Sequence, residues 1–313
     1  MDYRFTIIVV HRNGVELISR CLRAVLSIVS PEDHVVVVDN GSSDQSIERI
    51  KSDFHSVELI ENNCNKGFAA ANNQVLSRGN SHYYLLLNND VIVDAQLLEQ
   101  IISTFDEYPR AAVVSPQLCG MNGDIQRSSK DFMRPVDEVL PGFFRRKKAM
   151  QADSKVVQVD SVVGACMAVQ AGSINEAGVL DEDFFFYFEE TEWCNRFYKC
   201  GYTVLLDKKI RVIHEKGYST RSVRREAQIE MLNSRLIYYR KVFNPVVATL
   251  LTGYRVFRIL INFIFATILV LFTLGMVKRL RQNCMRYGSQ LVWLAIGRPS
   301  SWGLPDKCPL SSD

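Results

Sequence analysis

Apolar residues in the first two thirds of the chain fall in short runs that polar residues separate. The run at 83–93 contains three consecutive leucines and is interrupted by Asn88, Asn89 and Asp90. A long apolar run is typical of a strand buried on both faces in the middle of a parallel sheet. Asn88 and Asp90 would both point the same way at its carboxyl end, where open α/β sheets bind ligands. An ordinary strand-ending turn is the alternative interpretation, since Asn and Asp favour turns.

Strand-like and helix-like segments alternate on both sides of this run. Strands are predicted at 5–10, 35–38, 57–60, 111–114, 159–169, 202–206 and 210–214, the fourth ending at Pro116. Apolar residues at helical spacing predict helices at 15–29, 68–76, 96–105 and from 189 to about 200, with another that ends near Ile50. This alternation predicts an α/β fold with a mostly parallel central sheet, right-handed crossovers and flanking helices.

Polar turns follow the first strands and are candidates for ligand binding. His11-Arg12-Asn13-Gly14 follows the first strand, and Asp39 ends the second. Neither GxGxxG nor GxxxxGKS/T is present, which argues against the usual dinucleotide fold and against a P-loop. The Asp39 carboxylate can accept a hydrogen bond from an imide N–H such as that of uracil or thymine. It can equally cap the segment that follows, a role that Ser42 or Ser43 can also fill.

Three glutamates open the helix predicted from residue 189. Glu189, Glu190 and Glu192 follow an aromatic block at 184–188. The dipole at a helix N-terminus stabilises carboxylates, and one acidic residue would meet that need. Three beside aromatic rings favour a pocket wall, where apolar surroundings raise the proton affinity of a carboxylate and suit it to general-base catalysis. His214 ends a later strand, either at the mouth of the same sheet or as a hydrogen-bonded surface residue.

The C-terminal part of the chain differs from the rest in charge. The whole chain of 313 residues is 47% hydrophobic, enough for a sizeable core, and has a net charge of +3. From residue 208 onward, however, 18 Lys and Arg residues stand against 5 Asp and Glu residues. A basic tail can meet nucleic acid or an anionic membrane surface. The apolar residues beside it favour the membrane, and no nucleic-acid partner is expected.

An uncharged run at 259–277 indicates a membrane segment. At about 1.5 Å per residue, its 19 residues just cover the ~30 Å hydrocarbon layer. Basic residues on both sides leave open a spanning helix, a helix in the interface, or a re-entrant pair with 242–254. A buried helix of a soluble domain is a fourth interpretation. We therefore divide the chain into a catalytic domain at 1–220 and a basic, helical, membrane-associated region at 221–313, and removing residues after Asn244 should release the protein from membranes.

Cysteine usage and the N-terminus bear on the cellular compartment. The eight cysteines include no CxxC pair and no zinc-type cluster, so we expect reduced, mostly buried thiols. No signal peptide precedes the first strand, and we expect the catalytic domain on the cytoplasmic face of the inner (plasma) membrane. The polar stretch at 120–152 contains the cationic cluster 145–148, which either approaches an acceptor or membrane surface or is a solvated loop.

Seven segments of the chain together resemble a known family. They are IIVVHRNG (7–14), VVVVDNGSSDQS (35–46), NKGFAAANN (65–73), LLLNND (85–90), GACMAV (164–169), GVLDEDFFFYFEETEWCNRF (178–197) and VIHEKGYS (212–219). In this order and at this spacing they resemble the family 2 glycosyltransferases of the GT-A fold, and among these the rhamnosyltransferase-like branch. The resemblance covers roughly residues 5–219.

The resemblance implies a reaction and a set of site residues. The reaction is an inverting transfer of a sugar, rhamnose by its branch, from a nucleotide-diphosphate sugar to a hydroxyl of a lipid-linked or cell-surface glycan, with Mg²⁺ or Mn²⁺ as cofactor. By position, the resemblance implies that Asp90 and His214 hold the metal ion and that Glu190, next to Glu189, is the general base. It implies that the nucleotide lies against His11, Asn13, Asp39, Gly67, Asn72, Asn73 and Asn88.

Three positions depart from the family pattern. His11-Arg12 replaces the usual Asn-Tyr, Asn89 the usual Pro, and Glu190 the usual Asp base. With Asn88 in place of Asp, fewer protein charges hold the metal, so we expect metal binding that relies on the diphosphate. These changes keep a catalytically silent scaffold or glycan-binding protein as an alternative. A sugar-phosphate nucleotidyltransferase is another, but it needs a glycine-rich signature that residues 11–14 do not supply.

Overall fold

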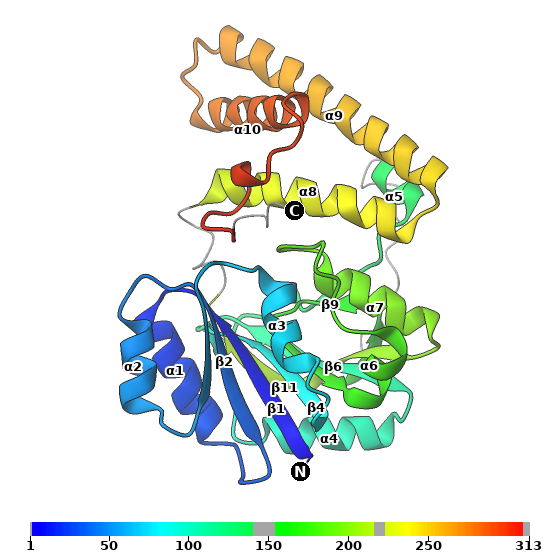
Figure 1. Cartoon of the computed structure of the whole chain (residues 1–313). Coiled ribbons are helices and arrows are strands. Elements are labelled where there is room, and N and C mark those ends of the chain that lie inside the picture. The colour runs from blue at the N-terminus through cyan, green and yellow to red at the C-terminus, as the bar shows by residue number, and fades with distance from the viewer. Residues whose placement is uncertain (1, 140–153, 216–222, 309–313) are drawn as a thin grey trace, which may run out of the picture.

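A nine-stranded sheet forms the centre of this computed structural model, which describes residues 2–139, 154–215 and 223–308 (Figure 1). Its strand order is β3-β2-β1-β4-β10-β6-β11-β5, with β8 paired to β11. The strands are β1 (Tyr3–His11), β2 (His34–Asn40), β3 (Glu58–Asn62), β4 (Ser81–Asn88), β5 (Val91–Ile92), β6 (Ala111–Cys119), β8 (Val156–Val159), β10 (Cys166–Gln170) and β11 (Thr203–His214). Because β10, β5 and β8 alone run against the other six, the mostly parallel sheet is confirmed.

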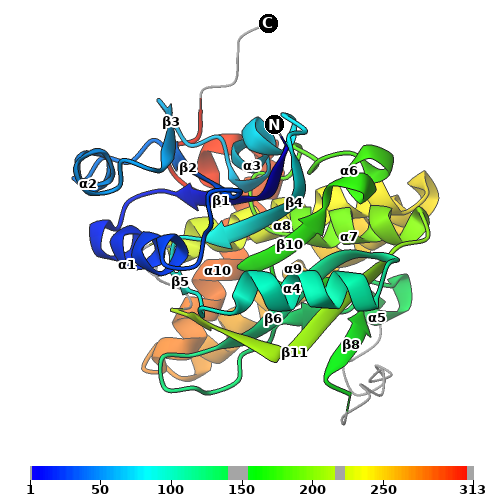
Figure 2. The same cartoon turned by 90° about the horizontal axis from the view of Figure 1, so that it is seen from below.

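Helices cover both faces of the sheet (Figure 2). Those on one face are α1 (Val15–Leu26), α2 (Ser46–Asp53) and α4 (Leu97–Glu107), and those on the other are α3 (Phe68–Leu76), α6 (Ala171–Ala177) and α7 (Glu189–Lys199). Alternate residues of β1 divide between the two cores, with Ile7 and Val9 in the first and Ile8 in the second. Burying each such side chain contributes about 1.5–3 kcal/mol, so packing on both faces holds the strand ends in place.

The run at 83–93 is not a single strand. Strand β4 ends at Asn88, and Asn89 and Asp90 form a turn. The chain then enters β5, whose Val91 is fully buried in the core beside α1 and α4 and pairs with His214. The apolar residues after the turn therefore belong to a second, antiparallel strand, which brings the end of β11 next to the turn.

Strand β6 continues past the predicted end at Pro116. Proline lacks the N–H that a ladder needs, but the pairing of β6 with β11 is irregular between Asp207 and Arg211, opposite this position. The two strands predicted between 202 and 214 are one bulged strand, β11. The single strand predicted at 159–169 is divided among β8, β9 (Ser161–Val162) and β10, and β9 pairs with β7 (Ser129–Lys130).

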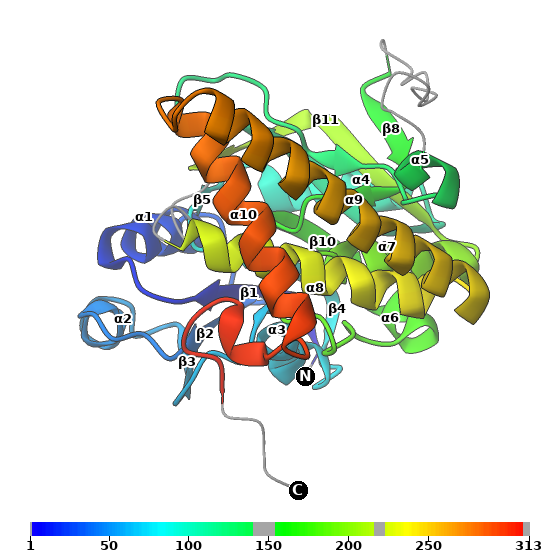
Figure 3. The ribbon, with the colours of Figure 1, turned by 90° about the horizontal axis from the view of Figure 1, so that it is seen from above.

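Three long helices lie above the catalytic part (Figures 1 and 3). They are α8 (Arg224–Val242), α9 (Pro245–Phe272) and α10 (Lys278–Ala295), followed by the short 3-10 helix η2 (Ser300–Trp302). Asn244 caps α9 by accepting a 3.0 Å bond from the Val247 N–H. One continuous helix thus covers most of the segments at 242–254 and 259–277, so the re-entrant pair, one of the four alternatives, is not formed. Within the described residues, α9 is the helix whose length and apolar composition would allow it to cross a membrane.

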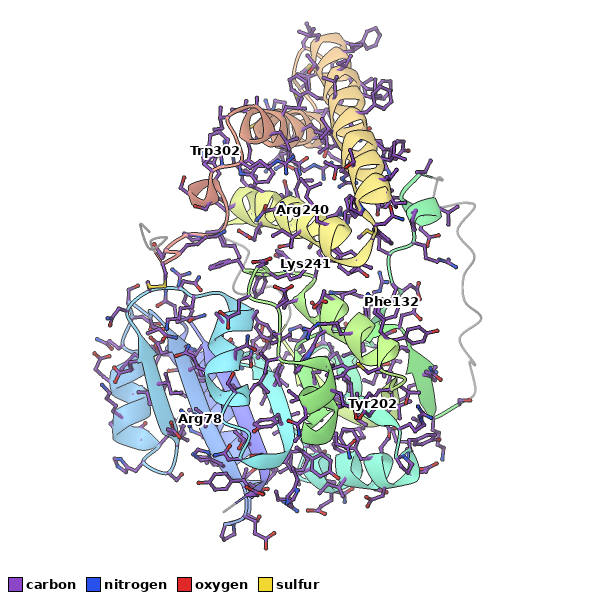
Figure 4. The ribbon with its side chains drawn as sticks, turned by 45° about the vertical axis from the view of Figure 1, so that its right-hand side comes forward. Arg78, Phe132, Tyr202, Arg240, Lys241 and Trp302 are labelled. Carbon is purple, nitrogen blue, oxygen red and sulfur yellow. A yellow bond between two sulfur atoms is a disulfide. The ribbon has the colours of Figure 1, made fainter. Side chains whose placement is uncertain are left out.

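Helix α8 joins the helical region to the catalytic part. The Ser234 hydroxyl donates to the Phe186 carbonyl at 2.7 Å, and Lys241 forms ion pairs with Asp181 and Asp183 in the loop after α6 (Figure 4). Phe184, in the same loop between α6 and α7, belongs to the apolar core of α8, α9 and α10. The helical region is therefore packed directly against the segment that precedes the glutamates of α7.

The segment after η2 returns to the catalytic part. Asn65 and the tail exchange backbone hydrogen bonds at Asp306 and Cys308, and Cys64 and Cys308 form a disulfide, visible in yellow in Figure 4. The expectation that all eight cysteines are free thiols is therefore wrong. The two partners are 244 positions apart, and only the return of the tail brings them together. Among the free cysteines, four are buried as predicted: Cys21, Cys119, Cys166 and Cys194.

Two predicted features lie outside the described residues. They are the cationic cluster 145–148 and the end of the VIHEKGYS segment, with Gly217 and Ser219. The described part of the 120–152 stretch contains β7 and the one-turn helix α5 (Pro135–Val139), which packs against α9.

Candidate active site

A cavity of about 270 Å³ opens at the carboxyl ends of β1 and β4. We call it the donor cavity. Four residues proposed for the nucleotide line it: His11, Asn13, Gly67 and Asn88. The other lining residues are Val10, Arg12, Asn40, Asn65, Phe68, Asn89, Phe185, Phe186, Val223, Leu304 and Pro305. The position agrees with the rule that α/β sheets bind ligands at the carboxyl ends of their strands.

Two residues that depart from the family pattern contact each other in this cavity. The Asn89 amide nitrogen lies 2.8 Å from Nδ1 of His11, and because the amide NH₂ can only donate, Nδ1 accepts. Burial lowers the pKa of His11 to about 4, so the ring is neutral at pH 7 and carries its proton on Nε2. Nε2 is buried and has no hydrogen-bond partner among the described residues. His11 therefore presents one fixed N–H donor.

Gly67 is required where α3 begins. Its φ is +86°, and an added Cβ would lie 2.5 Å from the carbonyl oxygen of Phe185. That same carbonyl accepts a 2.8 Å bond from the Phe68 N–H. The close approach holds the 184–188 segment against α3, and so places the Phe185 and Phe186 rings in the cavity wall. The aromatic block that the sequence singled out is thus part of the donor cavity.

Asp39 lies at the end of β2 but does not line the donor cavity. Its carboxylate accepts hydrogen bonds from the backbone N–H groups of Gly41 and Ser42, both at 3.0 Å, and from the Ser42 hydroxyl. These bonds close the turn after β2 and do not cap a helix, because α2 begins only at Ser46 and its N-cap residue, Gln45, makes no side-chain cap bond. The next residue, Asn40, lines the cavity and donates to the Gly67 carbonyl at 3.0 Å. The motif at 35–46 contains Asn40, but the resemblance assigned the nucleotide contact to the neighbouring Asp39.

Asn72 and Asn73, expected on the nucleotide side, also lie outside the cavity lining. Asn72 donates to the Phe68 carbonyl within its own helix at 2.8 Å. Asn73 donates to the Leu180 carbonyl at 2.8 Å and accepts from the Leu180 N–H at 3.1 Å. Both are buried, and α3 turns them away from the strand ends. Asn73 instead fixes the loop that leads to the aromatic block.

Asp90 and His214 lie side by side, as predicted for metal ligands. His214 Nε2 is 3.5 Å from Asp90 Oδ1, and Nδ1 lies 3.1 Å from Oε1 of the Gln126 side-chain amide. Because the Gln126 amide nitrogen donates to the His214 carbonyl, its oxygen accepts, and Nδ1 carries the imidazole proton. The Nε2 lone pair thus faces the Asp90 carboxylate. Burial raises the pKa of Asp90 to about 6.

This carboxylate–imidazole pair fits a divalent cation. Asp90 Oδ1 is buried and has no hydrogen-bond partner among the described residues, and a lone pair facing it is unfavourable without a cation or proton between them. Oxygen and imidazole nitrogen suit Mg²⁺ and Mn²⁺. The described residues contain no cluster of three or more His, Cys, Asp or Glu ligands. A cation here would therefore need further ligands from outside the protein.

Glu189 and Glu190 begin α7, immediately after two residues with positive φ, Tyr187 and Phe188. Both glutamates are buried. Lys130 forms an ion pair with one oxygen of Glu190, while Oε2 is buried without a hydrogen-bond partner among the described residues. Burial, followed by the charge of Glu190, raises the pKa of Glu189 well above its usual value. Lys130 comes from the polar stretch at 120–152, and no motif pointed to it.

A short segment connects Glu190 to the strand end at Asn88. A Cβ added at Gly164 would lie 3.6 Å from Cβ of Glu190 and 3.8 Å from the ring of Phe68, which lines the donor cavity. The next residue, Ala165, accepts a 2.9 Å bond from the Asn88 N–H. Asp90 thus directly follows the cavity residues Asn88 and Asn89 in the chain, and Glu190 lies next to Gly164, which also neighbours Phe68. Asp90, His214 and Glu190 themselves are not among the residues that line the donor cavity.

This arrangement defines an α/β enzyme that binds its ligand at the carboxyl edge of a central sheet. A family model for glycosyl transferase family 2 matches residues 6–175, and the chain belongs to this family. It is 21% identical over 207 residues to the N-acetylglucosaminyl-diphospho-decaprenol L-rhamnosyltransferase of Mycobacterium tuberculosis, covering 59% of this chain and 67% of that protein. It is 26% identical over 183 residues to the low-salt glycan biosynthesis hexosyltransferase Agl10 of Haloferax volcanii, covering 56% of each.

A solved structure confirms the fold. The mannosyltransferase PcManGT from Pyrobaculum calidifontis, in complex with GDP-Man and Mn²⁺, has a TM-score of 0.55 at 16% identity. The match covers 95% of this chain and 87% of that one. The expected GT-A type of α/β fold is therefore confirmed, and the matched region extends into the helices after the sheet.

Proposed function

We propose that this chain is an inverting glycosyltransferase that moves a sugar, rhamnose, from a nucleotide-diphosphate sugar to a hydroxyl of a lipid-linked glycan. Family membership supports the reaction class. The observation that carries the assignment is that the buried Asp90–His214 pair directly follows the cavity residues Asn88 and Asn89, while Glu190 lies beside Gly164, a neighbour of Phe68 in the cavity wall. A catalytically silent scaffold would have no need to keep these groups buried together.

The donor cavity suits the nucleoside part of the donor. Its polar groups are neutral amides and the neutral imidazole of His11, which can bond to a base or ribose. The rings of Phe185 and Phe186 offer apolar surface for a flat base. Arg12, a cation in the wall, is paired with Asp306. In this proposal the nucleoside is therefore recognised mainly by neutral hydrogen-bonding groups and aromatic rings.

Asp90 and His214 would hold a divalent cation, Mg²⁺ or Mn²⁺, with diphosphate oxygens completing its ligands. When bound, such a cation supplies stabilisation of the negative charge on a departing nucleoside diphosphate. Asp90 would have to be ionised to hold the cation. Its burial raises its pKa and so opposes ionisation, whereas a neighbouring positive charge favours it. His214 keeps its Nε2 lone pair directed at the same place because Gln126 holds Nδ1–H.

Glu190 is the general base in this proposal. Lys130 forms an ion pair with one of its carboxylate oxygens, and Oε2, which has no hydrogen-bond partner among the described residues, is available to take a proton. That proton comes from the acceptor hydroxyl, whose oxygen attacks the anomeric carbon from the side opposite the leaving group. One base and one leaving-group stabiliser suffice for a single inverting displacement. The raised pKa of Glu189 favours its protonated, neutral form, so that no second negative charge lies next to Glu190.

We place the enzyme on a membrane, at the cytoplasmic face of the plasma membrane. Helix α9 exposes Phe265, Ile268, Leu271 and Phe272 to solvent, an apolar surface that a membrane interface would cover. The stretch from Arg258 to the end of α9 at Phe272 is about 21 Å long at ~1.5 Å per residue, short of the ~30 Å core. We therefore propose a helix that lies in the interface, although the whole of α9, at 28 residues, is long enough to span. In a reducing cytoplasm the Cys64–Cys308 pair would be open to reduction.

A donor panel tests the proposal. The full chain in detergent is incubated with dTDP-, UDP- and GDP-sugars with Mn²⁺, with Mg²⁺ and with EDTA, and nucleoside diphosphate release is measured. We expect release from one nucleotide class, highest for dTDP-rhamnose, and its loss with EDTA. If no donor is turned over or bound under any condition, the glycosyltransferase assignment is wrong for this chain and the silent alternative takes its place.

A further inference from the structure

A second cavity, of about 440 Å³, lies between α8, α9 and α10, the three helices seen from above in Figure 3. We call it the arginine cavity. Five arginines line it: Arg224, Arg235, Arg255, Arg258 and Arg286. Its other lining residues include Tyr187, Asn262 and Gln290, and none of the lining residues is acidic. Such a density of guanidinium groups around one space predicts a negatively charged ligand.

Few carboxylates balance these charges. Glu138 of α5 accepts a 2.8 Å bond from Arg235, and its backbone carbonyl accepts one from Arg258 at 3.0 Å. The other oxygen of Glu138 is bonded to the Tyr239 hydroxyl at 2.7 Å. Within residues 2–139, 154–215 and 223–308, the five guanidinium groups thus contact one carboxylate, which leaves an excess of about four positive charges there. Clustered like charges are unfavourable in the empty protein, which indicates a binding role rather than a structural one.

Buried arginine N–H groups that lack acceptors among the described residues also indicate a negatively charged ligand. The Nε groups of Arg235, Arg255 and Arg286 are buried and have no hydrogen-bond partner among the described residues. Arg255 is the most enclosed case, because burial, followed by the charge of Arg235, lowers its pKa. Buried donors without acceptors cost stability unless a ligand supplies the acceptors. The flat fork of arginine matches the oxygens of phosphate and diphosphate.

The surroundings identify the kind of phosphate compound. Helix α9 leads from Arg255 and Arg258 directly into its exposed apolar part, with Ile261, Ile264 and Phe265. A ligand that is anionic at one end and apolar at the other would use both surfaces. Tyr187 lines the arginine cavity, and the preceding residue, Phe186, lines the donor cavity. The segment that separates the two cavities leads directly into Glu189 and Glu190.

We propose that the arginine cavity binds the diphosphate of a polyprenyl-diphosphate-linked acceptor, with the prenyl chain along α9. This inference rests on the proposed function, because it assigns the acceptor site of the same reaction. Binding there would hold the acceptor sugar beside the segment 186–188, on the way to Glu190. The shared chemistry is a diphosphate ester, and a free diphosphate or a phospholipid head group is the competing source.

Binding measurements on the full chain test the proposal. Isothermal titration in detergent uses four probes: farnesyl diphosphate, inorganic pyrophosphate, farnesol and phosphatidylglycerol vesicles. We expect binding of farnesyl diphosphate, weaker binding of pyrophosphate and none of farnesol. In the Arg255→Gln/Arg286→Gln variant, farnesyl diphosphate affinity should fall tenfold or more. Arg240→Gln, an exposed residue of α8 outside this cavity (Figure 4), is the matched control and should change nothing.

Two results would overturn the proposal: equal farnesyl diphosphate affinity in the variant and wild type, or displacement of farnesyl diphosphate by phosphatidylglycerol vesicles at equal phosphate concentration. Thermal unfolding shows whether the variant folds, and we expect an unchanged or higher midpoint because charge repulsion is removed. Should the double variant unfold, each single Arg→Lys variant takes its place, since lysine keeps the charge but loses the fork. Nucleotide binding with Mn²⁺ is measured on the same samples. If the protein binds nucleotide but not farnesyl diphosphate, the proposed function stands and this inference is wrong. A protein that binds farnesyl diphosphate but no nucleotide loses the proposed function instead.

Discussion

The donor cavity and the arginine cavity lie on two sides of one segment, 186–188, yet they are built on opposite electrostatic principles. The first is lined by amides, a neutral imidazole and aromatic rings, with its charged groups confined to one edge. The second is lined by five arginines and has almost no counter-charge. In the function proposed above, the donor brings its own cation, so its site would need only a carboxylate and an imidazole. The proposed lipid-linked diphosphate brings none, so its site would need fixed positive charge in the protein.

The largest effect is expected at Glu190, the proposed general base. Glu190→Gln keeps the size of the side chain but removes its ability to accept a proton, so sugar transfer should fall by about 10²–10⁴-fold. Donor and farnesyl diphosphate affinities should stay within about twofold. Steady-state transfer and titration of both ligands measure these quantities. Glu192→Gln is the matched control, since Glu192 is bonded to Arg196 at 2.9 Å and is not assigned to catalysis.

Transfer by Glu190→Gln at the wild-type rate would show that another group takes the proton. Glu189, one position earlier, would then be the first to examine by the same substitution. A loss of donor affinity in Glu190→Gln would instead mean that the two cavities are not as separate as their linings suggest.

An intermediate effect is expected on the pH dependence of the free energy of unfolding, because His11 in the donor cavity is buried and neutral. Burial lowers the pKa of His11 from 6.5 to about 4, so as pH falls the unfolded chain takes up this proton first. The free energy of unfolding of wild type should therefore fall relative to that of His11→Asn, by up to about 3 kcal/mol between pH 6.5 and 4, and the difference should be constant above pH 6.5. Urea denaturation over this pH range measures it. Parallel curves for the two proteins would contradict a buried neutral His11, whereas Arg255→Gln should parallel wild type throughout.

The smallest effect is expected at the outer surface of α9. Phe265→Asp and Leu271→Asp replace side chains that are 62% and 70% exposed, so the fold should be unchanged. Each should weaken sedimentation with vesicles by about tenfold, because an apolar group no longer enters the interface. Farnesyl diphosphate titration in detergent should be unaffected for Leu271→Asp, which is distant along the helix from Arg258. Undiminished vesicle binding by both variants would place the membrane contact elsewhere.

Sequence motifs predicted the donor cavity because its parts are local. His11 and Asn88 end strands, Asn13 lies just before α1 and Gly67 just before α3, and strand ends of a parallel sheet meet at one edge. The same logic failed at Asn72 and Asn73, since a motif gives positions but the helical rotation of α3 decides which side chains face the cavity. Asp39 was ambiguous for a similar reason.

The arginine cavity could not be predicted in this way. Its residues come from three helices, and their charges were visible only as the basic excess of the tail. Lys130 and the Cys64–Cys308 bond were hidden for the same reason, because tertiary contacts between distant segments define them. Even Pro116, a local signal for a strand end, was overridden by an irregularity in the partner strand.

The returning tail has a consequence for biosynthesis. Leu304 and Pro305 form part of the donor cavity wall, and they are translated after all three long helices. A nascent chain that has completed its sheet therefore still lacks this part of the cavity wall until all three long helices have been synthesised.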